Sequence, residues 1–140
     1  MKIAIINGPN LNLIGTRETG IYGSETFEHY FSKLRKKYES VDFDYFQSNV
    51  EGELINEIQN ASETMDGIIL NAGAYTHTSL AIGDAIASIK IPVVEVHISN
   101  IEAREEFRKY SHISSKCAGT IFGFGLKGYA LAVESFLIKE

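Results

Sequence analysis

Short apolar, β-rich runs alternate with helical patterns along the whole chain of 140 residues, and this alternation constrains the fold more than any other feature. Strands are predicted at residues 2–6, 41–47, 67–71, 92–98 and 119–122. Helices are predicted at residues 24–38, with Ser24 as the N-terminal cap, then at 53–63, 79–89, 102–108 and from about 126 to the chain end. Strands that alternate with helices form a parallel sheet covered on both faces. The pattern therefore predicts a doubly wound α/β fold with a five-stranded parallel sheet.

One domain is expected to span residues 1–140, because no repeat, linker, low-complexity tract or change in composition interrupts the chain. A chain of this length buries roughly two thirds of its unfolded surface, which is enough for one core. The unbroken apolar runs at 67–70 and 92–94 predict central strands, since a strand buried on both faces has continuous rather than alternating apolar residues.

The composition excludes some classes of partner. A formal net charge of -5 argues against a broad nucleic-acid surface, although it leaves room for a small anionic substrate bound by a few local groups. The single cysteine, Cys117, excludes an internal disulfide and a multi-cysteine metal site, which suits a reducing compartment. The apolar run at 3–6 is too short for a signal-peptide core, and no segment approaches membrane-spanning length. The expected location is the cytoplasm, with no membrane partner.

Three polar segments are expected to meet at one edge of the sheet. Residues 7–22 follow the first predicted strand, residues 71–79 the third and residues 97–108 the fourth. Ligands of such sheets bind outside the carboxyl ends of the strands, so the three segments predict a single active site. The loop at 8–23, GPNLNLIGTRETGIYG, is too long and too polar for a tight turn. Its interspersed apolar residues predict an ordered lid over that site.

Several polar residues in these segments have two interpretations. Glu95 and His97 are two residues apart on a strand and should point to the same face. His97 is either a buried histidine bonded to a carboxylate or a titrating imidazole with an orienting acid, suited to acid–base catalysis near neutral pH. His77 is either a surface histidine at a helix cap or, with Asn71 beside it, part of a site at the positive end of the next helix.

Tyr22 and the arginines of these segments are also open to more than one interpretation. Tyr22 would normally pack or form a hydrogen bond, but a nearby Arg17 would lower its pKa and make it a plausible base. Arg104 and Arg108 are four residues apart among three glutamates, so the default expectation for both is a solvent-exposed helix charge.

The segment 123–128, Gly-Phe-Gly-Leu-Lys-Gly, matches the GxGxxG pattern of dinucleotide-binding folds. It follows the last strand, however, and the chain ends before the acidic ribose partner expected about 20 residues later. The glycines are therefore interpreted as a tight strand-to-helix junction, and no nicotinamide cofactor is expected.

Together, the segments GPNLNLIGTRETGIYG, FQSNVEGELI, ILNAGAYTHTSLAIGDAI, PVVEVHISN, AREEFRKYS and GTIFGFGLKGYALA closely resemble the type II 3-dehydroquinate dehydratases of the shikimate pathway. The resemblance covers nearly the whole chain. It implies conversion of the anionic substrate 3-dehydroquinate to 3-dehydroshikimate and water through an enolate, without metal or cofactor. It also implies a flavodoxin-like domain and a dodecamer built from trimers.

The resemblance implies a role for particular residues. Tyr22 is matched to the base that removes the proton next to the ketone, and Arg17 to the charge that keeps it ionised. Asn10 is matched to a residue that positions a water against the enolate oxygen. His97 is matched to the acid that protonates the departing hydroxyl, with Glu95 behind it. Substrate-binding positions are matched by Asn71, His77, Ile98, Ser99 and Arg108, and Asp84 is matched to an acidic residue that reaches a neighbouring subunit's site.

The chain departs from the family pattern at Thr19, where the lid usually has a proline after Arg-Glu, and a looser lid is the expected consequence. Two other functions stay open on the residues alone. A flavodoxin-like binding module would share the fold, but it would not account for Arg17, Tyr22 and His97 at one strand edge. A catalytically inactive paralogue would keep the binding residues.

Overall fold

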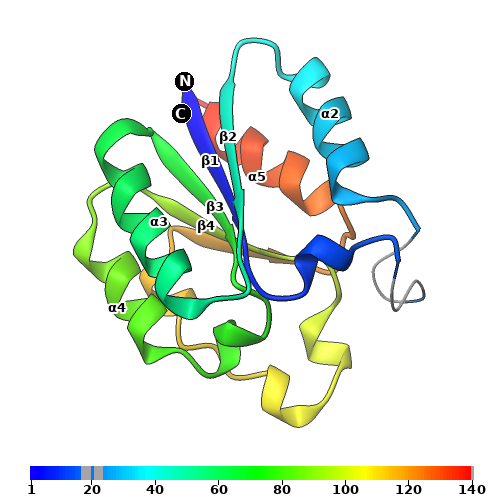
Figure 1. The fold of residues 1–140 in the computed structure, drawn as a ribbon, viewed down its shortest axis with the longest axis vertical. Coiled ribbons are helices and arrows are strands. Elements are labelled where there is room, and N and C mark those ends of the chain that lie inside the picture. The colour runs from blue at the N-terminus through cyan, green and yellow to red at the C-terminus, as the bar shows by residue number, and fades with distance from the viewer. Residues whose placement is uncertain (17–19, 21–23, 140) are drawn as a thin grey trace.

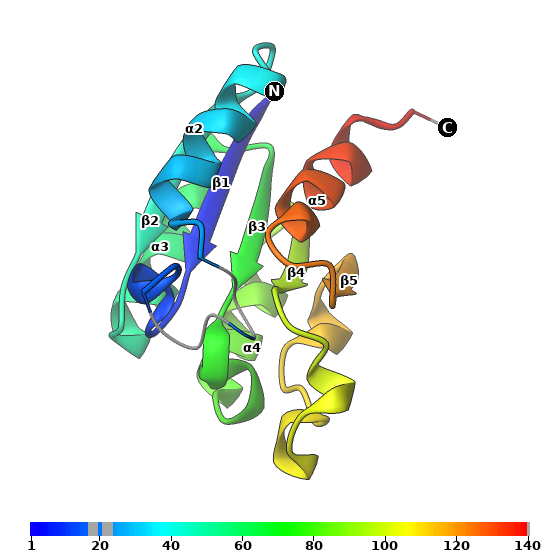
Figure 2. The same cartoon turned by 90° about the vertical axis from the view of Figure 1, so that its right-hand side faces the viewer.

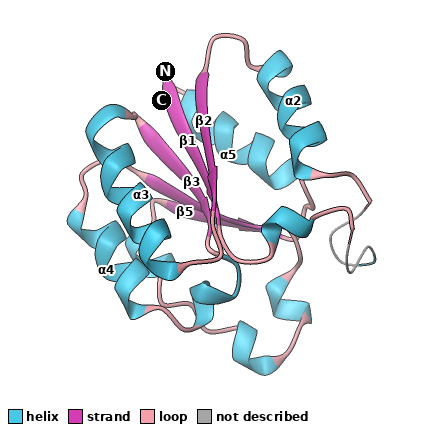
Figure 3. Cartoon of the chain, viewed as in Figure 1, coloured by secondary structure: helices cyan, strands magenta, loops and turns pink. Residues whose placement is uncertain are grey.

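The computed structural model describes residues 1–16, 20 and 24–139, which form five strands and four α-helices (Figures 1 and 3). The strands are β1 (Lys2–Asn7), β2 (Asp42–Gln47), β3 (Gly67–Asn71), β4 (Val93–His97) and β5 (Gly119–Phe122). The helices are α2 (Phe27–Lys37), α3 (Glu51–Thr64), α4 (Leu80–Ser88) and α5 (Lys127–Leu137). All neighbouring strands are parallel, in the order β2-β1-β3-β4-β5. The predicted doubly wound, flavodoxin-like sheet is confirmed.

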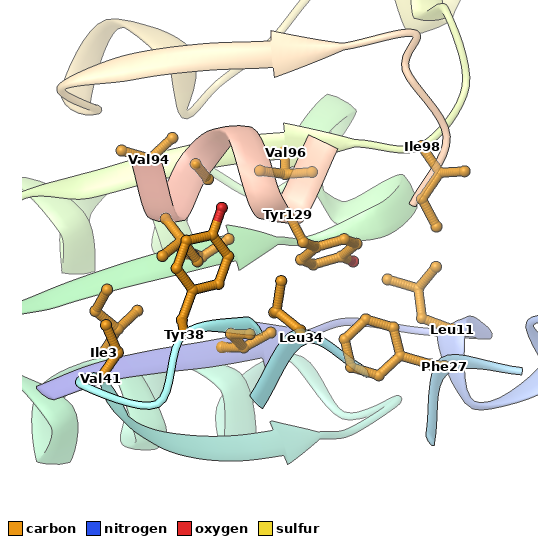
Figure 4. Close-up of a cluster of buried hydrophobic side chains, with 14 of the residues drawn as sticks. Ile3, Leu11, Phe27, Leu34, Tyr38, Val41, Val94, Val96, Ile98 and Tyr129 are labelled. Atoms are coloured by element: carbon orange, nitrogen blue, oxygen red, sulfur yellow. The ribbon is translucent and has the colours of Figure 1, made fainter. Parts of the chain in front are cut away.

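Helices cover both faces of the sheet, with α2 and α5 on one side and α3 and α4 on the other (Figure 2). Successive residues of β1 point into opposite layers, as the pleat requires. Ile3 (Figure 4) and, two residues on, Ile5 pack in the layer of α2 and α5. Ala4 and Ile6 pack in the layer of α3 and α4. Every residue of β3 and β4 is buried, so the prediction of central strands at the two apolar runs is also confirmed.

Strand limits agree with prediction to within one residue, but two helical predictions are wrong. Helix α2 is capped by Thr26, whose side chain accepts a hydrogen bond from the backbone N–H of His29, and not by Ser24. Thr26 has extended backbone angles and directly precedes the buried Phe27, which gives it the position of a cap.

The predicted helix at 102–108 is instead two 3-10 turns, η3 (Ile101–Ala103) and η4 (Glu106–Arg108). The extended backbone of Arg104, with φ -103° and ψ -163°, ends the first turn. Ile101 is the only buried residue of the two turns, so the segment has no apolar face to pack against the core, and such packing is what stabilises most short helices.

The loops after β1 and β3 pass very close to one another. A side chain at Gly8 would place its Cβ 2.6 Å from the carbonyl oxygen of Ala72, so only glycine fits there. The backbone N–H of Gly8 donates to the carbonyl of Asn71 at 2.7 Å. This close approach brings the polar residues that follow both strands to the same edge of the sheet.

Candidate active site

A pocket opens at the carboxyl edge of the sheet, where the segments after β1, β3 and β4 meet. Its lining residues are Pro9, Asn10, Leu11, Ile14, Asn71, Gly73, Ala74, His77, His97, Ile98, Ser99, Ile101, Arg104 and Arg108. The cavity volume of about 100 Å³ suits a small molecule rather than a dinucleotide. The predicted meeting of three polar segments is therefore observed for the described residues. Arg17 and Tyr22 lie outside the described residues.

His97 and Glu95 form a buried pair at the end of β4. The two side chains share a face of the strand, as expected, and His97 Nε2 donates to Glu95 Oε2. The other carboxylate oxygen accepts hydrogen bonds from the hydroxyls of Ser114 and Thr120. Because Nε2 is bound to the carboxylate, Nδ1 is the ring nitrogen left for a ligand in the pocket.

The hydrogen bonds to Glu95 determine its charge. Burial raises the pKa of its carboxyl group, but the hydrogen bonds from His97, Ser114 and Thr120 and the charge of His97 together outweigh burial, so the pKa lies below its ordinary value. Glu95 is therefore ionised at neutral pH. It holds the His97 ring in one orientation and can stabilise the ring when it carries a second proton.

His77 lies beside His97 in the 3-10 turn η2 (Gly73–His77), with ring centroids 6.2 Å apart and an interplanar angle of 25°. His77 Nδ1 donates to the carbonyl of Tyr110 at 2.7 Å, so Nε2 is the acceptor nitrogen of the neutral ring. Burial lowers the pKa of His77, and the neighbouring His97 and Arg108 lower it further. A neutral His77 gives the pocket a hydrogen-bond acceptor next to the ring of His97.

Asn71 is the last residue of β3, and both polar atoms of its side-chain amide form hydrogen bonds. Its Oδ1 accepts from the backbone N–H of Gly73 at 3.1 Å, and its Nδ2 donates to the hydroxyl of Tyr129 at 3.0 Å. Tyr129 lies on the buried face of α5, which is otherwise apolar. Its polar contact spans 58 residues of sequence, and no local pattern signals it.

Asn10 stands at the start of the 3-10 turn η1 (Leu11–Leu13) with φ 68°, in the left-handed region that asparagine tolerates better than most residues. Its backbone N–H donates to Asn49 Oδ1 at 2.9 Å, and Gln47 Nε2 donates to the carbonyl of Gly8 at 3.1 Å. The end of β2 thus holds the loop that carries Asn10, a role the sequence did not indicate.

The outer part of the pocket is cationic. Ile98 and Ser99 follow the last residue pair of the β4–β5 ladder, so their backbone lies beyond it at the pocket. Arg104 Nη1 donates to Ser99 Oγ at 3.4 Å, and Arg108 Nε pairs with Glu105 at 2.5 Å. Both arginines line the pocket, so the default expectation of plain surface charges does not describe them.

Asp84 is the one described candidate that the fold leaves away from the pocket. It is exposed on α4 and is absent from the pocket lining. The glycines of the GxGxxG segment serve the junction before α5: Gly123 and Gly125 have φ 95° and 64°, and their N–H groups donate to the carbonyls of His97 and Ile98.

The described residues show neither a cluster of metal ligands nor a helix that could span a membrane. No group of three or more His, Cys, Asp or Glu side chains within them is arranged to hold a metal ion. Within the same residues, no helix is both long and apolar enough to cross a membrane.

Comparisons with known proteins agree with one another. The model of the family described as dehydroquinase class II matches residues 1–137. A 3-dehydroquinate dehydratase of Campylobacter jejuni is 55% identical over 139 residues, covering 98% of this chain and 87% of the relative. One of Clostridium beijerinckii is 51% identical, covering 100% and 98%. The crystal structure of a type II dehydroquinase from Butyrivibrio crossotus matches with a TM-score of 0.95 at 47% identity, covering 99% of this chain and 98% of that one.

Proposed function

The chain belongs to the class II dehydroquinase family, and we propose that the pocket at the carboxyl edge of its sheet is the active site of its reaction. That reaction is the hydro-lyase step of the shikimate pathway that converts 3-dehydroquinate to 3-dehydroshikimate and water. The observation that carries the proposal is the buried Glu95–His97 pair beside the pocket, next to Asn71 and His77.

The acid of the reaction is His97. Hydroxide is a poor leaving group, so the departing hydroxyl has to be protonated as the bond to carbon breaks. His97 gives this proton from Nδ1 while Nε2 stays bonded to Glu95, whose negative charge stabilises the protonated ring. The buried carboxylate also fixes the direction in which the ring presents its free nitrogen.

The base is Tyr22, with Arg17 holding it ionised. This assignment rests on the match of the loop at 8–23 to the family pattern, since both residues lie outside the described part of the chain. Removal of the proton next to the ketone produces an enolate, which needs a positioned donor. Asn10, which lines the pocket, supplies that donor through a water.

The remaining pocket residues bind the substrate. The backbone N–H groups of Ile98 and Ser99 receive the carboxylate, and Arg108 contributes positive charge beside them. Asn71 and His77 bind hydroxyl groups of the ring. None of the three polar segments contains a lysine, so the route does not use a lysine imine.

The proposal extends to the setting of the enzyme. Residues 1–140 act as one catalytic domain in the cytoplasm, and the active form is a dodecamer of trimers in which Asp84 reaches a neighbouring subunit's site. The position of Asp84, exposed on α4 and away from its own chain's pocket, supports this arrangement. Light scattering on the native protein tests it, and a fully active monomer would contradict it.

An absorbance assay for enone formation from 3-dehydroquinate tests the proposed reaction and its base. Native protein should turn over, whereas Tyr22→Phe and Arg17→Ala should each lose most of the activity. Arg17→Lys should recover little, because a point charge lacks the fork of the guanidinium. The matched control is Tyr110→Phe, which removes the hydroxyl of an exposed tyrosine and should leave turnover unchanged. An active Tyr22→Phe protein, or a borohydride-trapped lysine adduct, would overturn the mechanism.

A further inference from the structure

A chain of hydrogen bonds between buried and half-buried side chains runs from the pocket across the sheet to β2. Asn71 Nδ2 donates to the hydroxyl of Tyr129 at 3.0 Å, and that hydroxyl donates to Asn7 Oδ1 at 2.7 Å. Asn7 Nδ2 in turn donates to the hydroxyl of Tyr45 at 3.3 Å. Asn7, Asn71 and Tyr129 are all buried, so their polar groups depend on one another.

The direction of every bond in this chain is fixed by one backbone group. The N–H of Gly73 can only donate, so the atom of Asn71 that it meets must be Oδ1. Nδ2 therefore faces the Tyr129 hydroxyl, which accepts that hydrogen and must give its own to Asn7 Oδ1. One amide hydrogen of Asn71 then remains, and no described residue accepts it.

The hydroxyl of Tyr129 is suited to this task because it keeps its hydrogen. Burial raises the pKa of Tyr129 far above its ordinary value, more than the hydrogen bonds that the hydroxyl makes with Asn71 and Asn7 lower it. The group is thus one acceptor and one donor at every physiological pH. Bulk water does not reach the hydroxyl, since the side chain is 0% exposed.

We propose that Tyr129 is a positioning residue of the enzyme, whose hydroxyl locks the amide of Asn71 so that its remaining N–H is presented to the substrate. This inference deepens the proposed function, on which it rests, since it requires Asn71 to bind substrate. Tyr129 does not touch the reacting atoms and acts only through Asn71. Loss of its hydroxyl weakens substrate binding by leaving Asn71 and Asn7 without their shared partner.

The chain offers a matched control in Tyr38. Tyr38 and Tyr129 belong to the same buried cluster between α2 and α5 (Figure 4), and both have bonded hydroxyls. The hydroxyl of Tyr38 donates to Glu134 Oε1 at 2.8 Å and to the carbonyl of Ala130 at 3.5 Å, and neither residue lines the pocket. Tyr38→Phe and Tyr129→Phe therefore make the same chemical change in the same layer, but only Tyr129→Phe removes a hydrogen bond to a pocket residue.

The test measures KM, kcat and urea unfolding for both variants. Removal of a buried hydrogen-bond partner should lower the unfolding midpoint of both. For Tyr129→Phe, KM should rise roughly tenfold while kcat stays within about threefold of native. For Tyr38→Phe, both kinetic constants should stay native. A native KM in folded Tyr129→Phe, or an equal rise in KM for the two variants, would overturn the proposal.

A double-mutant cycle with Asn71→Ala separates this inference from the proposed function. If Tyr129 acts through Asn71, Tyr129→Phe should change KM little further in the Asn71→Ala background. Additive rises in KM would contradict the positioning role of Tyr129 but would leave the proposed function intact. A native KM in Asn71→Ala itself, or a native enzyme without turnover, would instead contradict the proposed function.

If Tyr129→Phe does not fold, Asn7→Ala provides the second test. It keeps Tyr129 but removes the acceptor that directs its hydroxyl hydrogen. A smaller rise in KM that vanishes in the Asn71→Ala background supports the proposal, and an unchanged KM in folded Asn7→Ala overturns it.

Discussion

The two walls of the pocket are built in different ways. The inner wall is formed by Asn71 and His97 at the ends of β3 and β4, and their partners are buried side chains such as Glu95 and Tyr129. The outer wall is formed by η3 and η4, where Arg108 pairs with Glu105 through side chains that are 24% and 48% exposed. Core packing therefore orients the inner wall, whereas local and solvent-screened contacts hold the outer wall.

This difference separates the expected effects of mutation. A change in the inner wall removes partners from buried groups, so it should lower activity and folding stability together. A change in the outer wall breaks contacts that water can replace, so it should weaken binding and leave folding stability intact. Four substitutions test the distinction.

The largest effect is expected for His97→Asn in the inner wall. Loss of the acid should lower kcat by about 10²–10⁴-fold, the usual value of a positioned proton transfer. The unfolding midpoint should also fall, because the buried Glu95 loses a hydrogen-bond donor. The enone assay and urea unfolding measure the two effects, with the exposed His29→Asn as a control that changes neither. Native turnover in a folded His97→Asn protein would exclude the acid role.

Glu95→Gln should have the next largest effect, and one that depends on pH. At neutral pH we expect a loss of about 1–3 kcal/mol in the free energy of unfolding, since a charged acceptor of three hydrogen bonds is replaced. The pKa of Glu95 is lowered in the folded protein, so its stabilisation is present above its unfolded pKa of ~4.3 and is lost as pH falls through the folded pKa.

Urea unfolding of both proteins across the acid range checks this sign. The difference between native and Glu95→Gln protein should be largest near neutral pH and should shrink toward the acid end. A difference that grows as the pH falls would mean that the carboxyl is not held ionised by its partners.

Arg108→Ala in the outer wall should raise KM by roughly tenfold, because a charged contact to an anionic substrate is lost. The kcat value and the unfolding midpoint should stay close to native. The rise in KM should be smaller at high salt, where exposed charges are screened. Arg35→Ala, an exposed arginine on α2, is the control for the loss of one positive charge. A lowered unfolding midpoint in Arg108→Ala would remove the distinction between the walls.

The smallest effect is expected for Glu105→Gln. The exposed carboxylate holds Arg108 at the pocket, and this hydrogen bond lowers the pKa of Glu105. Solvent can take over the contact, so KM should change by less than about threefold and the unfolding midpoint should not move. A KM as high as that of Arg108→Ala would show that the pair, rather than the arginine alone, forms the binding group.

The sheet and the meeting of polar segments could be predicted because both depend on local patterns. Continuous apolar runs identify the buried strands β3 and β4, and parallel connections bring their carboxyl ends to one edge. The pairing of Glu95 with His97 follows from their spacing of two on a strand. The same reasoning failed at 102–108, where charged residues at helical spacing lie on two turns broken at Arg104.

The partners that orient the site could not be predicted. Ser114 and Thr120 reach Glu95 from 19 and 25 residues away, and Tyr129 reaches Asn71 from 58. Tyr129 lies on an otherwise apolar face of α5, so the neighbouring sequence does not indicate which group its hydroxyl bonds. Contacts of this kind depend on the tertiary fold, and no spacing rule within one element encodes them.

The hydrogen bond from Tyr129 to Asn7 joins the last helix to the first strand across 122 residues. Synthesis proceeds from the N-terminus, so Asn7 is made long before Tyr129, the residue that bonds its side chain. The binding wall can become complete only when α5 has left the ribosome and docked. A nascent chain stalled before residue 129 would thus contain all five strands of the sheet but not the hydroxyl that bonds Asn7 and Asn71, so on the proposed role of Tyr129 full substrate binding would arrive with the last helix of the chain.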